Sequence, residues 1–297
     1  MTTIDRAFKK TRQQPSGRVS ECIPEKKSKP HNVDFAILDL AQQDEGVLLG
    51  WLYSHFGHEE IPWVSLYFGS ELNNDWMAGP ILVELRDCDA FQNALIERCQ
   101  TEYLGVFIHA GDTSLVTMAE HLRSLITVQL DNKPALFRFY DPRSLGPLLE
   151  VLEPAQRRRL TGPAERWSWH QYQNWYQWEA QAGSTTPAID KSLSISATQR
   201  VQMDAARSRH FAQSLTHTYR AQIPADDAET FVMNEVRAAD SAGLTSLADQ
   251  ERWLRVALRV QQPLMNSPPW CAIARSGEKT PAQILNQLEC EQGCNAC

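Results

Sequence analysis

Two aspartates, with an arginine near them, are candidates for acid–base chemistry by their carboxylates. Asp39 ends the apolar run of residues 36–38, and Asp141 ends an aromatic run that contains Arg138. If both runs are strands of one sheet, the two carboxylates converge at the strand ends beside the guanidinium. Because paired carboxylates are the catalytic groups of glycosidases, these residues support a hydrolase or transferase as one hypothesis.

Each of these residues also has a structural interpretation. Asp141 precedes Pro142, and this order is typical of a helix N-cap followed by the first helical residue. An unpaired guanidinium in an aromatic strand is costly, so Arg138 either pairs with Asp39 or Asp141 or binds a carboxylate of an incoming peptide. Arg143 opposes the dipole of the helix that it begins, so it faces an acid within the chain or on a partner.

The cysteines offer thiol chemistry or metal ligation. An odd number of them in a chain of 297 residues is typical of free thiols in a reducing compartment. Three cysteines near the chain end have a spacing that could hold zinc or an iron–sulfur cluster, but chain ends more often fray. We therefore predict no metal site and no cofactor. The seven are Cys22, Cys88, Cys99, Cys271, Cys290, Cys294 and Cys297.

Aromatic side chains concentrate in residues 166–178. Tryptophan and tyrosine are enriched at protein interfaces; they also line sugar-binding clefts, or they pack between domains. We predict a partner-binding surface there, together with the aromatic run before Asp141, and we expect Asp39, Asp141 and Pro142 to be structural. The predicted partner-binding residues are Arg138, Tyr140, Arg143, Trp167, Trp169, Trp175 and Trp178.

The elements that must position these residues fall into two parts. Residues 33–180 alternate strand-like apolar runs with helical periodicity, which predicts an α/β domain, and a hairpin around residues 131–134 makes its sheet mixed. Residues 181–193 have the small, polar, proline-containing composition of a linker. Residues 194–289 predict a smaller all-α domain, and its first helix opens with the capping box of Ser196 and Gln199.

The two terminal segments and the net charge of the chain argue against some classes of function. Residues 1–32 are rich in lysine and arginine and predict a disordered basic arm, and residues 290–297 form a cysteine-containing tail. The net charge of −7 argues against a nucleic-acid partner. Because no run approaches the ~20 apolar residues of a membrane span and no secretory signal is present, we expect a cytoplasmic protein without a membrane partner.

A set of short motifs resembles those of a known family. The most specific is the run of residues 137–143, Phe-Arg-Phe-Tyr-Asp-Pro-Arg. Weaker motifs lie around it in a consistent order, at residues 36–39, 63–67, 79–85, 121–123, 126–128, 152–154, 162–163 and 167. Over residues 34–170 the chain resembles the effector adaptors, or effector chaperones, of the bacterial type VI secretion system. The loop of residues 109–112 departs from that family's pattern, and beyond residue 170 only the general helical character is similar.

The resemblance implies a non-enzymatic adaptor. Such a protein binds a toxic effector in the cytoplasm and promotes its loading onto the spike protein, so the implied partners are the cognate effector and the spike. The effector is then delivered in interbacterial competition. This interpretation and the carboxylate enzyme are the two main hypotheses, and a structural component of the secretion machine is a third.

Overall fold

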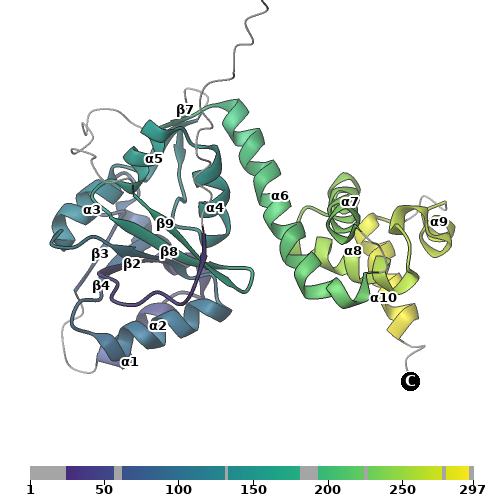
Figure 1. The fold of residues 1–297 in the computed structure, drawn as a ribbon, viewed down its shortest axis with the longest axis horizontal. Coiled ribbons are helices and arrows are strands. Elements are labelled where there is room, and N and C mark those ends of the chain that lie inside the picture. Colours follow the sequence, from purple (N-terminus) through teal and green to yellow (C-terminus); the bar gives the residue numbers. More distant parts are fainter. Residues whose placement is uncertain are drawn as a thin grey trace, which may run out of the picture.

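A seven-stranded antiparallel sheet organises the N-terminal part of the protein (Figure 1). The computed structural model describes residues 25–56, 62–130, 133–180, 193–223, 227–275 and 279–293. Within these residues the strand order is β1-β9-β8-β5-β2-β4-β3, and every neighbouring pair is antiparallel. The strands are β1 (Glu25–Lys27), β2 (Phe35–Asp39), β3 (Trp63–Ser65), β4 (Pro80–Glu84), β5 (Gly105–His109), β8 (Arg166–Gln171) and β9 (Asn174–Glu179).

Both faces of this sheet are buried, and the alternation of side chains along a strand divides them between two cores. In β2, Phe35 and Ile37 belong to one hydrophobic cluster, and Ala36 and Leu38 belong to the other. The first cluster includes side chains of α3 (Leu115–Arg123), α4 (Pro142–Val151) and α5 (Pro154–Thr161). The second includes side chains of α1 (Val47–Phe56) and α2 (Asp89–Thr101). Helices therefore cover the sheet on both sides.

A second, small sheet lies beside the first cluster. It consists of β6 (Thr127–Leu130), β7 (Lys133–Leu136) and β10 (Ser194–Ile195), in the order β10-β6-β7. The β6–β7 hairpin is antiparallel, whereas β10 pairs with β6 in parallel. Parallel and antiparallel pairing are thus mixed in the small sheet, because the chain returns to β6 from a distant point in the sequence.

The C-terminal part of the protein is helical. The long helix α6 (Ala197–Tyr219) contacts both α4 and α7, and Figure 1 shows it running from the α/β part to the remaining helices. Two apolar clusters hold these helices together, one around Phe211 and Leu254 and the other around Trp253 and Leu285. The remaining helices are α7 (Ala228–Ser241), α8 (Leu247–Val260), α9 (Pro268–Ala274) and α10 (Pro281–Gly293).

Polar contacts fasten α6 to α4. The carboxylate of Glu150 in α4 accepts hydrogen bonds from Arg209 and His210 of α6. Burial alone would raise the pKa of Glu150, but the two donors outweigh that effect and lower the pKa below its ordinary value. Near the start of α6, the Gln199 side chain donates to the carbonyl of Val151 over 3.2 Å. These contacts connect the α/β part directly to the first helix of the helical part.

The predicted fold class is confirmed: an α/β part with flanking helices precedes a helical part. The capping box of Ser196 and Gln199 is also confirmed. Residues 181–192 of the predicted linker and residues 1–24 of the predicted arm lie outside the described residues. At the end of that arm, Glu25–Lys27 pairs with β9 as a strand, which differs from the disorder that composition predicts. Among the described residues, no helix has the length and hydropathy to cross a bilayer.

Candidate functional site

The aromatic motif of residues 137–143 forms a corner between β7 and α4. We expected a strand through Tyr140, but β7 ends at Leu136 and the chain then turns. Consequently Phe137, Phe139 and Tyr140 are all buried rather than alternating between two faces. Asp141 caps α4 by accepting from the amide of Arg143, as predicted.

Two arginine–aspartate pairs hold this corner in place. Arg138 forms an ion pair with Asp39, a carboxylate that is only 2% exposed at the end of β2. Burial lowers the pKa of Arg138, but the neighbouring Asp39 carboxylate outweighs this and the pKa is raised overall. Arg143 donates to Asp141 from Nε and Nη2, each over 2.9 Å. The acid that faces Arg143 is therefore within the chain.

Two tyrosines bring distant motif segments to the same corner. Tyr140 forms a hydrogen bond with Tyr67, and burial together with the nearby Asp39 raises the pKa of Tyr140. Tyr67 in turn packs so closely on Gly79 that a Cβ at that position would lie 2.4 Å from its ring. Three of the motifs that carry the family resemblance therefore meet in space.

The four predicted partner-binding tryptophans are not on the surface, and this part of the prediction is wrong. Trp167 and Trp169 in β8 are 0% exposed, and Trp175 and Trp178 in β9 are 6% exposed. Strand β8 lies between β5 and β9, so its side chains point into the helix-covered faces of the sheet. The tryptophans therefore pack in the two cores of the large sheet, rather than on a partner surface or between the domains. Tyr140 is likewise buried at 1%, so only the two arginines of the predicted partner-binding set remain accessible.

A groove of about 210 Å³ opens beside the corner. Its walls are the small sheet, α4 and α6, and its lining is mainly apolar, with Phe137 and Leu148 among the contributing residues. Among the described lining residues, Arg138 and Arg200 are the charged ones. Sequence reasoning missed Arg200 and its neighbour Met203, because only the parallel pairing of β10 with β6 brings the start of α6 to this place.

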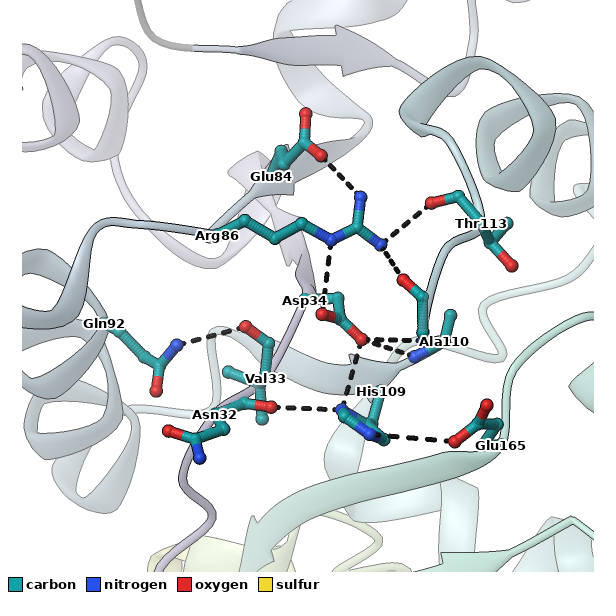
Figure 2. Close-up of polar contacts among 11 residues, drawn as sticks. Asn32, Val33, Asp34, Glu84, Arg86, Gln92, His109, Ala110, Thr113 and Glu165 are labelled. Atoms are coloured by element: carbon teal, nitrogen blue, oxygen red, sulfur yellow. Dashed lines mark hydrogen bonds and ion pairs between the residues drawn. The ribbon is translucent and has the colours of Figure 1, made fainter.

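A second polar cluster, also missed, lies at the opposite end of β2 (Figure 2). The Asp34 carboxylate accepts from the amides of Ala110 and Gly111, over 2.6 and 3.1 Å, and from Arg86 Nε over 3.2 Å. His109 Nδ1 lies 3.1 Å from the same carboxylate.

Arg86 completes this cluster. It reaches Glu84 over 2.7 Å and the carbonyls of Gly111 and Thr113 over 2.6 and 2.8 Å. The loop of residues 109–112, which departs from the family pattern, is thus held by hydrogen bonds to residues next to β2 and β4. With each charged group paired inside the chain, the cluster has the features of a structural clamp.

The cysteines that the structure describes are not grouped as metal ligands. Cys99 is buried, and burial raises the pKa of its thiol, which makes it unreactive. Cys290 is exposed on α10, whereas Cys294 and Cys297 lie outside the described residues. In the ranges that the structure describes, no group of three or more His, Cys, Asp or Glu side chains is arranged for a metal ion.

The buried His121 predicts a pH dependence of stability. Its Nε2 lies 3.1 Å from the carbonyl of Leu160. Burial lowers its pKa from 6.5 to about 4, although the bond to Leu160 opposes the shift. As the pH falls below 6.5 the unfolded chain binds a proton at this residue, and the folded chain does not until about pH 4. Stability is therefore lost in this window, by about 1–3 kcal/mol for a group that is partly accessible.

The substitution His121→Gln isolates this effect. Glutamine keeps a donor for the Leu160 carbonyl but does not titrate. Urea unfolding followed by tryptophan fluorescence between pH 7 and pH 4 should show a smaller loss of stability for the variant than for the wild type. Equal losses in the two proteins would contradict the assignment.

Comparison with known proteins gives a match in the same part of the chain as most of the motifs. No curated protein and no solved structure matched the chain. Residues 35–159 match the family model described as "Domain of unknown function (DUF4123)". The match begins at the first residue of β2 and ends within α5, so it contains the arginine–aspartate corner and most of the groove walls. In this region, from β2 to α5, the chain is similar to the DUF4123 domain.

Proposed function

We propose that this protein is a non-enzymatic adaptor that binds a type VI secretion effector and promotes its loading onto the spike protein. The observation that carries the proposal is the corner of residues 137–143, which lies in the DUF4123-like region and forms a wall of an accessible groove. An apolar groove with few charged groups is suited to holding a segment of another polypeptide. Because an adaptor of this kind acts before secretion, we place the protein in the cytoplasm.

The carboxylate enzyme is less well supported. It required an open site in which Asp39 and Asp141 were available to a substrate. Asp39 is buried and accepts from Gln42 and from the Ala41 amide in addition to its pair with Arg138. Asp141 is engaged by the amide and guanidinium of Arg143. Both carboxylates therefore have structural roles that account for their positions.

Co-purification tests the proposal. The full chain is expressed with the toxin encoded beside its gene, and the tagged chain is purified and then separated by size. We expect the two proteins to elute as one stoichiometric complex, and the spike protein to join when it is added. A toxin from an unrelated secretion cluster is the specificity control and should not co-elute. If the neighbouring toxin elutes alone, the proposed function is wrong.

A further inference from the structure

The outer edge of β7, with the groove behind it, has the features of a peptide-binding site. We propose that an extended segment of the effector adds to β7 as a further strand, places alternate apolar side chains in the groove and pairs an acidic residue with Arg138 and Arg200. This inference rests on the proposed adaptor function. It adds the place, the backbone conformation and the charge of the bound segment.

The hydrogen bonds of the hairpin show which backbone groups of β7 point outward. The amide of Phe137 donates to the carbonyl of Ile126 over 2.8 Å, so the backbone amide of Phe137 points toward β6. Because direction alternates along an antiparallel strand, the amide and carbonyl of Leu136 point away from β6. β7 is last in the order β10-β6-β7, and Leu136 is 51% exposed. Among the described strands, none pairs with this edge.

Alternate side chains of a strand added at this edge would point into the groove. Val128 of β6 and Ala135 of β7 are directly paired and therefore lie on the same face of the small sheet. Both line the groove, as do Leu148 of α4 and Met203 of α6 on its opposite side. Every second residue of an added strand points to this face. The groove, at about 210 Å³, exceeds the ~150 Å³ of a cavity that accepts benzene, so it has room for a large apolar side chain.

The charges of the groove select an acidic peptide. Arg138 and Arg200 both line it, and the lining residues that the structure describes include no aspartate or glutamate. The Arg138 side chain is 42% exposed although it pairs with Asp39, and its planar fork has donors beyond the one that reaches Asp39. Arg200 is exposed at the start of α6. Since the chain as a whole has a net charge of −7, a cationic groove is a local feature that favours a carboxylate.

The edge also has a feature that restricts its pairing. Pro134 occupies the other outward-facing position of β7, two residues before Leu136. Its carbonyl can accept a hydrogen bond, but it has no amide to donate, and prolines on edge strands limit indiscriminate pairing between sheets. Of the two outward-facing residues, Pro134 and Leu136, only Leu136 has an amide that can donate a hydrogen bond to an added strand. A single substitution at Leu136 therefore tests strand addition.

A peptide library displayed on phage is the probe, selected against the full-length protein. We expect enriched sequences in which apolar residues alternate and at least one aspartate or glutamate occurs. Synthetic peptides of these sequences are then measured by fluorescence anisotropy. The variant Leu136→Pro removes the outward amide and should weaken binding about tenfold, whereas Leu136→Ala keeps the amide and should stay within about threefold.

A charge reversal tests the acidic residue in the same assay. Arg200→Glu should weaken binding about tenfold or more, and Arg207→Glu, the same change on the same helix outside the groove lining, should leave it unchanged. Circular dichroism and thermal unfolding verify that each variant folds. The inference is overturned if no sequences are enriched, if the enriched peptides bind Leu136→Pro as tightly as wild type, or if they are basic.

The effector assay separates this inference from the adaptor function. If the toxin co-purifies equally with wild type and with Leu136→Pro, the adaptor function stands and strand addition at β7 is wrong. If the toxin does not co-purify with the wild type, the adaptor function itself fails. If the protein instead self-associates through β7, size separation should show a dimer that Leu136→Pro abolishes, and the edge then serves a second copy of this chain, against the proposal.

Discussion

The variant Gly105→Ala is expected to lose about 3 kcal/mol of stability or more. Gly105 begins β5 and pairs with Leu38 of β2 in the middle of the large sheet. A Cβ at this position would lie 1.8 Å from the carbonyl oxygen of Ile37. That oxygen belongs to the backbone of a central strand with no exposed residue, so the clash is relieved only by separating the two strands. Urea unfolding followed by tryptophan fluorescence measures the loss.

Gly50→Ala is the matched control. Gly50 lies within α1, and a Cβ there would meet nothing within 4 Å. Because alanine has a higher helix propensity than glycine, this variant should gain about 0.5–1 kcal/mol. A Gly105→Ala protein as stable as wild type would show that β2 and β5 are not packed as closely as the structure has them.

Arg86→Ala is expected to lose about 2–4 kcal/mol. Arg86 contacts Asp34, Glu84 and two carbonyls of the loop after β5, as Figure 2 shows. Its guanidinium also lies 4.6 Å from the centre of the Phe35 ring. Removing it leaves the Asp34 carboxylate, 14% exposed, without its arginine partner. Chemical denaturation measures the loss, and faster amide hydrogen exchange in residues 109–113 locates it.

Two further substitutions test the cause of that loss. Arg86→Lys keeps the charge but not the planar fork, so we expect it to recover less than half of the stability. Lys29→Ala removes an exposed pair with Glu97, at 3.9 Å, and should change stability by less than about 0.5 kcal/mol. If Arg86→Ala unfolds no more easily than Lys29→Ala, the clamp contributes nothing to stability.

Local features of the sequence were sufficient to predict several of the elements. Asp141 caps α4 and Ser196 caps α6 because the capping hydrogen bond spans only two or three residues. The buried runs of β2 and β5 were recognisable as strands by their apolar composition. The residues of the family motif likewise identified the DUF4123-like region before any contact was known.

The sequence by itself therefore determined the α/β part, the helical part and the location of the motif. Only the tertiary structure decided which side chains meet. Asp39 and Arg138 pair although 99 positions separate them, the tryptophans of β8 are buried because that strand lies inside the sheet, and the groove exists because β10 brings α6 over the small sheet. Caps and periodicity depend on hydrogen bonds and burial within a few residues, whereas these contacts depend on strand order, which no local pattern encodes.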